Sequence, residues 1–281
     1  MNIQIMKTYK ESFQNVRSHK GEWMRVAYGP LLIWGLGALI LVLAFLSSGQ
    51  TFEMHKALTG GVVTQQEDSL FLTLAHIIYS ITYFIAMTSL TINGYRYAIL
   101  QEGGRSLITL NLNMRFVKIV LYYILVAILG GIFVGISAGL IFGVHLLLDN
   151  IAVDVILGIL LGLFGFYLAF RITLYPVLIS VDQSAPLSTS WRLMRGNVLR
   201  LLGLVILLTL TVLLIGVIGV LVLVLITALF SMVSPILGVL TLLLWLFFVV
   251  FWVLLIWAVM SKAMGLVFLE LSNKGKKELK K

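Results

Sequence analysis

The sequence contains no cysteine among its 281 residues, and only 11% of them are charged. The lack of cysteine excludes a disulfide framework and thiolate chemistry. In soluble domains about a quarter of the residues are charged, so the low charged fraction argues against a soluble protein. Residues 1–27 also lack the apolar core of about 7–15 residues that a cleavable signal peptide needs, and we expect no such peptide.

Catalytic and metal-binding motifs are missing from the sequence as well. It has no HExxH, no GxSxG, no P-loop and no paired carboxylates at a working spacing. The four histidines fall in four different segments: His19, His55, His76 and His145. We therefore expect no catalytic residue, no metal ion and no cofactor, and we predict that the protein is not an enzyme.

Apolar residues, in contrast, make up 60% of the chain, and the mean hydropathy is +1.09. A helix needs about 20 predominantly apolar residues to cross the hydrocarbon core. Six stretches satisfy this: 28–48, 69–91, 117–147, 155–180, 201–232 and 235–259. The run from 201 to 259 is too long for one span, and Ser234-Pro235 is a natural break. The sequence predicts an all-α membrane protein with one six-span domain, residues 1–281.

Basic residues are distributed very unevenly around these spans. All lysines and arginines except Lys56 lie before the first span, around the loops between spans two and three and between spans four and five, or beyond the sixth. Because lysine and arginine mark the cytoplasmic face of a membrane protein, both termini are expected to be cytoplasmic. Basic clusters beside spans are typical of contact with anionic lipid, and they lack the interleaved aromatic residues of a nucleic-acid site. We expect lipid contact and no nucleic acid.

The segment 184–197 is a polar, basic stretch between the fourth and fifth spans. Pro186 suits a first helical turn, and Gly196-Asn197 is a stop signal. In such a helix Leu187, Trp191 and Met194 share one face. We expect the helix to lie along the cytoplasmic interface, with Trp191 at the depth of the lipid headgroups.

Two further segments carry apolar stripes at helical spacing: Met6, Tyr9, Phe13 and Val16 before the first span, and Leu107, Leu110 and Met114 before the third. The predicted unit is a short interfacial amphipathic helix followed by a hairpin of two spans, and it occurs three times. The alternative is that cytoplasmic loops between spans tend to be amphipathic without being repeats.

Glycine recurs every fourth residue in the third predicted span, and the fourth span adds two more. The residues are Gly131, Gly135, Gly139, Gly143, Gly158 and Gly162. Small residues at this spacing let helix backbones approach closely. We interpret the pattern as packing between spans three and four, with a dimer interface or a ligand groove as the alternative.

The second predicted span carries the most polar stripe within the membrane, and His76, Ser80 and Tyr83 are its central residues. An ionisable residue inside a membrane is a functional candidate, so a substrate path or a proton relay is one interpretation. The simpler one is a neutral histidine that is hydrogen-bonded between helices.

Arg171 lies near the cytoplasmic end of the fourth span, just before Tyr175-Pro176, which should kink or end the helix. Asp182 and Glu270 are candidate partners, and such an ion pair would lock hairpins together. In the alternative, Arg171 extends to a lipid phosphate. The candidates for contact with lipid or a protein partner are Trp191, Arg192, Arg195, Arg200, Arg171 and Asp182.

About 40 residues around this segment resemble the glycerophosphoryl diester phosphodiesterase membrane-domain family and the related YciC-like bacterial inner-membrane proteins. The matching residues are Arg171, Pro176, Asp182, Ser190, Trp191, Arg192, Leu193, Arg195, Gly196, Asn197 and Arg200. The resemblance implies a multi-pass protein of the bacterial cytoplasmic (inner) membrane. It does not imply the activity in the family name, because the chain has no room for a phosphodiesterase domain.

We therefore expect a non-enzymatic membrane protein that acts as a scaffold or supports envelope or lipid-related functions. Its expected partners are anionic lipids at the cytoplasmic face and either another membrane protein or a second copy of the chain. The alternative is a transporter or channel for a small molecule or lipid, with a polar path along the second span.

Overall fold

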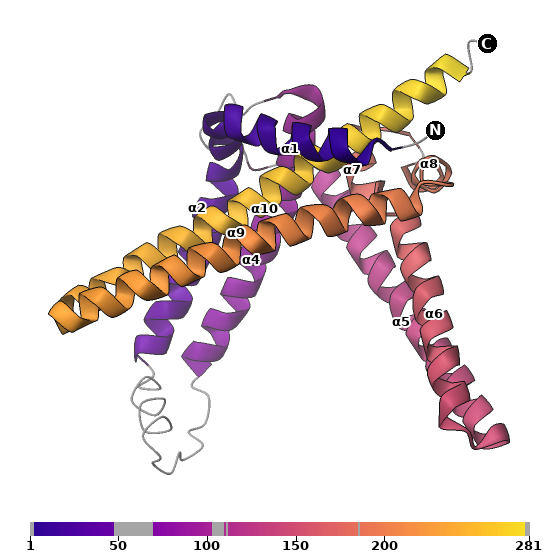
Figure 1. Cartoon of the computed structure of the whole chain (residues 1–281), viewed down its shortest axis with the longest axis horizontal. Helices are drawn as coiled ribbons and strands as arrows, with labels where there is room; N and C mark the ends of the chain where they lie inside the picture. Colours follow the sequence, from indigo (N-terminus) through magenta and orange to yellow (C-terminus); the bar gives the residue numbers. More distant parts are fainter. Residues whose placement is uncertain (1–2, 48–69, 103–109, 111, 185, 279–281) are drawn as a thin grey trace.

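The structure is a computed structural model that describes residues 3–47, 70–102, 110, 112–184 and 186–278 (Figure 1). Every secondary-structure element in these residues is a helix, which confirms the predicted all-α class. Six helices are long and apolar enough to cross a membrane. They are α2 (Lys20–Ser47), α4 (Leu70–Leu100), α5 (Met114–Leu148), α6 (Ile151–Arg171), α9 (Val198–Val233) and α10 (Pro235–Glu278). The protein is a multi-pass membrane protein.

Three shorter helices lie near the ends of the long ones: α1 (Ile5–Ser18), α7 (Tyr175–Ser180) and α8 (Pro186–Leu193). The fourth predicted span is divided, because α6 ends at Arg171 and α7 begins at Tyr175 with Pro176 in its first turn. The predicted break at Ser234-Pro235 is also present, since α9 ends at Val233 and α10 begins at Pro235.

Two helices extend well beyond the predicted span ends at residues 91 and 259. The extensions contain polar residues that find partners on neighbouring helices. In α4, Asn93 Nδ2 donates to Val26 O at 3.0 Å. In α10, Lys262 Nζ donates to Ala98 O at 3.0 Å. A prediction from hydropathy ends a span at the first polar residues. The helix itself continues past them where neighbouring helices provide hydrogen-bond partners for their side chains.

The long helices pack in consecutive pairs, α2 with α4, α5 with α6 and α9 with α10. The three pairs diverge from a common end, where α1, α7 and α8 also lie (Figure 1). We call this common end the base. It gathers the start of α2, the end of α4, the starts of α5 and α9, and the C-terminal half of α10.

The main hydrophobic core of the described chain lies in the base. Trp23 is at its centre and makes edge-to-face contacts with Tyr97 and Trp257, with ring centroids 4.7 and 5.4 Å apart. Leu174 and Met194 are completely buried in the same core. Because these residues come from α2, α4, α10, the segment between α6 and α7 and the turn after α8, burial of their side chains holds all three hairpins together at one end.

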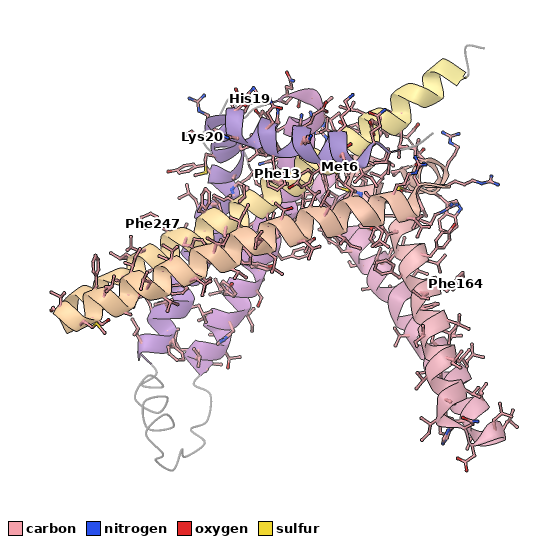
Figure 2. All side chains as sticks on the ribbon, viewed as in Figure 1. Met6, Phe13, His19, Lys20, Phe164 and Phe247 are labelled. Carbon is pink, nitrogen blue, oxygen red and sulfur yellow. The ribbon has the colours of Figure 1, made fainter. Side chains whose placement is uncertain are left out.

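Away from the base, the hairpins expose their apolar side chains. Figure 2 shows Phe164 on α6 and Phe247 on α10, which are 53% and 71% exposed, directed away from their helices. Over its whole length α6 buries only Arg171. Apolar surface on this scale is suited to contact with lipid.

Most of the glycine stripe does not mark the close approach between α5 and α6. A Cβ atom at Gly131, Gly135, Gly139, Gly143 or Gly162 would meet nothing within 4 Å, and one at Gly158 would meet only Ile141, at 3.7 Å. The close approach between α5 and α6 occurs at Gly165 instead, where a Cβ would lie 2.5 Å from the ring of Phe133. Five of the six glycines of the stripe thus make no close contact with the opposite helix.

Gly94 offers a test of the base. A Cβ at this buried residue of α4 would lie 2.6 Å from Ser261 Oγ and 2.9 Å from the ring of Trp257 on α10. We expect Gly94→Ala to lower the thermal unfolding midpoint in detergent, because overpacking costs about 1–3 kcal/mol, more than the ~1 kcal/mol that alanine gains in helix propensity. The control Gly135→Ala, in open space, should leave the midpoint unchanged or raise it. Equal shifts for both variants would contradict this packing.

Candidate functional site

Within the segment 184–197, residues Pro186–Leu193 form the helix α8 that the sequence predicts. Pro186 is the first helical residue, and the helix stops before Gly196, whose φ of +77° suits glycine and is costly for most other residues. On the buried side, Ser190 Oγ donates to the carbonyl oxygen of Arg171 at 3.0 Å. This bond fixes α8 against the end of α6.

The predicted apolar face of α8 is divided in the structure. Met194 is completely buried in the base, whereas Leu187 and Trp191 are 43% and 42% exposed. Arg192 and Arg195 are exposed as well. The outer surface of α8 thus presents apolar and basic side chains together, which is the composition of a helix at a lipid interface.

Arg171 lies beneath α8 and is only 6% exposed. Its guanidinium carbon is 4.3 Å from the centroid of the Trp191 ring and 5.7 Å from that of the Tyr167 ring. Its Nη1 donates to Tyr167 Oη at 3.3 Å, and its buried Nε has no hydrogen-bond partner. Arg171 is therefore held by aromatic side chains.

The predicted ion pairs of Arg171 are not formed. Asp182 binds two other arginines, and Glu270 accepts a hydrogen bond from the backbone nitrogen of Gln4 at 3.2 Å. Among the described residues, no carboxylate lies within ion-pair distance of Arg171. The physical reason is competition, since Arg96 and Arg115 reach Asp182 from two other helices.

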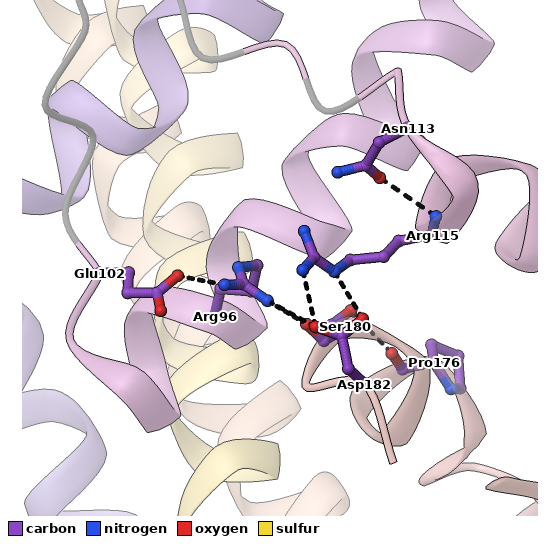
Figure 3. A network of polar contacts seen from close by, with 7 residues as sticks. All are labelled: Arg96, Glu102, Asn113, Arg115, Pro176, Ser180 and Asp182. Atoms are coloured by element: carbon purple, nitrogen blue, oxygen red, sulfur yellow. Dashed lines mark hydrogen bonds and ion pairs between the residues drawn. The ribbon is translucent and has the colours of Figure 1, made fainter. Parts of the chain in front are cut away.

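Asp182 is the centre of a polar network at the base (Figure 3). Arg115 donates through Nε to Asp182 Oδ1 at 2.8 Å and through Nη2 to Oδ2 at 2.6 Å, a two-point contact. Arg96 Nη1 donates to Ser180 O at 2.9 Å and to Asp182 Oδ2 at 3.4 Å, and Arg96 also pairs with Glu102. The network connects α4, α5 and the end of α7.

The network keeps Asp182 ionised. The hydrogen bonds from Arg115 lower the pKa of the Asp182 carboxyl below its usual value of 3.8. Burial opposes this shift, and the positive charges of Arg115 and Arg96 add to the lowering. Asp182 also adopts a left-handed backbone conformation, with φ of +57°, which aspartate and asparagine tolerate better than most residues. From the sequence alone, Arg96 and Arg115 indicate only the membrane topology.

The amphipathic helix α1 is also part of the base. Val16 is buried and Tyr9 and Phe13 pack against the core, but Met6 is 57% exposed. Tyr9 Oη and Thr211 Oγ1 on α9 are 3.1 Å apart. The apolar face of α1 thus contacts α9 and α10. Of the third predicted stripe, Leu107 lies outside the described residues and Met114 is exposed.

The polar stripe of α4 lies on an exposed face. His76 Nδ1 is 2.9 Å from Leu72 O, and Ser80 Oγ donates to His76 O at 2.8 Å, so both use the backbone of their own helix. The ring of Tyr83 stacks on Tyr79. The structure thus gives these residues neither a facing helix nor a lining role in a described pocket.

A groove of about 390 Å³ lies elsewhere, between α1, α2 and α10. Its lining is apolar apart from Lys20 and includes Trp23, Met24, Phe251 and Leu254.

Among the described residues, no group of three or more histidine, aspartate or glutamate side chains is placed to hold a metal ion. Arg200, the remaining candidate, lies half-buried in the first turn of α9.

Asp182→Asn tests the network. Asparagine keeps the shape and tolerates the backbone conformation, but it lacks the charge that two arginines share, so the thermal unfolding midpoint should fall by the equivalent of roughly 1 kcal/mol. Because the folded state lowers the pKa of Asp182, its contribution is complete above pH 3.8 and is lost as the pH falls below that value.

The difference between the wild type and Asp182→Asn should therefore be constant from about pH 5 to 8 and shrink in stronger acid. Glu102→Gln is the matched control, because Glu102 pairs with Arg96 at the edge of the network, and its effect should be smaller. A difference that persisted undiminished in acid would show that the charge of Asp182 is not responsible.

Comparison with known proteins identifies a family but no characterised relative. A family model described as a domain of unknown function, DUF7847, matches residues 23–268. No curated protein and no solved structure matches the chain. The match covers α4, α5, α6 and α9 and most of α2 and α10, and it includes the α7–α8 segment and the Asp182 network. Because it spans most of the sequence, the chain belongs to the DUF7847 family.

Proposed function

We propose that this protein is a non-enzymatic scaffold of the bacterial cytoplasmic membrane, with both termini in the cytoplasm, and that it binds anionic lipid through α8. The observation that carries the proposal is the outer surface of α8, where Leu187 and Trp191 lie exposed beside Arg192 and Arg195. Such a surface buries its apolar side chains at the level of the headgroups while its arginines contact phosphates.

The arrangement of the hairpins supports a scaffold. Their core and polar network are concentrated in the base, and the hairpins diverge from it with apolar surfaces (Figure 1). A base of this kind holds α8 in a fixed position relative to three membrane anchors. The basic ends of the long helices gather there as well, which agrees with a cytoplasmic base.

The resemblance to the phosphodiesterase membrane-domain and YciC-like families remains a prediction, since the DUF7847 description names neither. It is compatible with the proposal, because that resemblance implies a membrane module and no activity. The proposed function includes no reaction, and it requires only that α8 be accessible to lipid headgroups.

The double variant Arg192→Ala/Arg195→Ala should weaken the association with anionic lipid. Each basic residue near an anionic surface contributes about 1 kcal/mol, so the enrichment of phosphatidylglycerol over phosphatidylethanolamine around the purified protein should fall by up to about thirtyfold. Lipid extraction followed by mass spectrometry measures this ratio. The control Arg192→Lys/Arg195→Lys keeps both charges and should retain most of the enrichment. An unchanged lipid profile in the alanine variant would contradict the proposal.

The transporter alternative makes a different prediction for α4. A polar path along α4 would expose Ser80 and Tyr83 to water, whereas a lipid-facing stripe would not. Since the chain has no cysteine, single Ser80→Cys and Tyr83→Cys variants give an unambiguous reaction with membrane-impermeant thiol reagents. We expect no labelling. Asp149→Cys is the positive control, because the Asp149 side chain is 97% exposed at the tip of the α5–α6 hairpin. Labelling of Ser80→Cys at a comparable rate would favour a transport path.

A further inference from the structure

Arg171 is the only residue that α6 buries, and its surroundings are unusual for a charged group. A guanidinium has five N–H donors and no acceptor. Among the described residues only Tyr167 Oη accepts a hydrogen bond from it, and Nε is buried without a partner. Removing an ion from water without a counter-charge is costly. The unused donors and the unbalanced charge indicate that an anion completes this site.

The aromatic side chains that contact Arg171 reach the surface of the protein. Trp191 covers one face of the guanidinium at 4.3 Å, but Trp191 and Tyr167 are themselves 42% and 41% exposed. The buried guanidinium is thus in contact with two aromatic side chains that are both partly exposed. Tyr167 Oη, which accepts from Arg171, retains its own O–H to donate to the same anion.

We propose that Arg171, Tyr167 and Trp191 form a binding site for one phosphate group, carried either by the headgroup of an anionic phospholipid or by free phosphate. The planar fork of a guanidinium suits two oxygens of a phosphate. Tryptophan and tyrosine are the residues enriched at the depth of lipid headgroups. The position of Arg171, at the end of a membrane span and under α8, places it at that same depth.

This site is distinct from the exposed surface of Arg192 and Arg195. It deepens the proposed function and rests on it in one respect, that α8 lies at the headgroups. The surface of Arg192 and Arg195 attracts many lipids weakly, whereas the Arg171 site takes one phosphate with directional hydrogen bonds. The Asp182 network cannot substitute for this site, because its arginines are already paired with carboxylates.

The test is a titration of delipidated protein in detergent with phosphatidylglycerol, in which native mass spectrometry gives the affinity of the first bound lipid. Arg171→Met removes the donors and keeps the bulk, and it should weaken that affinity by about tenfold or more, since a charged hydrogen bond is lost. Arg17→Met, at an exposed arginine in the last turn of α1, is the control and should change it by less than about threefold. Tyr167→Phe, which removes one hydroxyl, should give an intermediate loss and covers the case in which Arg171→Met fails to fold.

Two further measurements, a titration with diacylglycerol and a competition with inorganic phosphate, identify the source of the phosphate. Diacylglycerol, which has acyl chains but no phosphate, should show no dependence on Arg171. Inorganic phosphate that competes with the first lipid, and does so only when Arg171 is present, would assign the site to free phosphate; an absence of competition would assign it to the lipid. Equal binding of both phosphatidylglycerol and phosphate by the wild type, Arg171→Met and Tyr167→Phe would overturn the proposal.

The two proposals fail separately. Loss of the first lipid in Arg171→Met, together with an unchanged lipid profile in Arg192→Ala/Arg195→Ala, would retain the phosphate site and reject the lipid-binding role of the α8 surface. Unchanged binding of the first lipid in Arg171→Met, together with a changed lipid profile in Arg192→Ala/Arg195→Ala, would reject the phosphate site alone.

Discussion

The three hairpins are joined by hydrogen bonds at the base, because apolar contact alone does not select one helix neighbour over lipid in a bilayer. The bonds between hairpins come from a few polar side chains. Lys262 on α10 donates to Ala98 O and Trp257 Nε1 to Leu90 O, both on α4. Asp182 joins arginines from α4 and α5. These contacts explain why the hairpins converge at their basic ends. Farther from the base, the described side chains make no such hydrogen bonds between hairpins, and the hairpins diverge.

The sequence predicts the features that depend on local composition and spacing. The six long helices follow from hydropathy, and both ends of α8 follow from Pro186 and Gly196, because each signal acts within its own turn. Features that depend on a partner elsewhere in the chain are not predicted. The spacing of the glycines defines a helix face but not what that face meets. Likewise, the ends of α4 and α10 depend on carbonyl groups that accept from Asn93 and Lys262, and no window of sequence contains both partners.

The base also explains how a short helix such as α8 becomes a defined surface. An isolated helix of eight residues is not stable in water, and α8 owes its position to Ser190, to the burial of Met194 and to the turn at Gly196. These contacts fix one side of α8, so the side chains of the other side, Trp191 and Arg192 among them, are presented in one orientation. A surface that is oriented by a rigid base suits a scaffold.

The acidic residues of the base have partners other than Arg171, which supports the proposed phosphate site. Five acidic side chains described there already have partners: Glu11 with Lys7, Glu22 with Tyr97, Glu102 with Arg96, Asp182 with Arg96 and Arg115, and Glu270 with the backbone of Gln4. The two arginines of the network are balanced by two carboxylates, and this balance makes the network a structural clamp. Arg171 is balanced by none of them and is shielded by aromatic rings. Because no carboxylate of the described residues pairs with Arg171, its charge is available to a ligand from outside the chain.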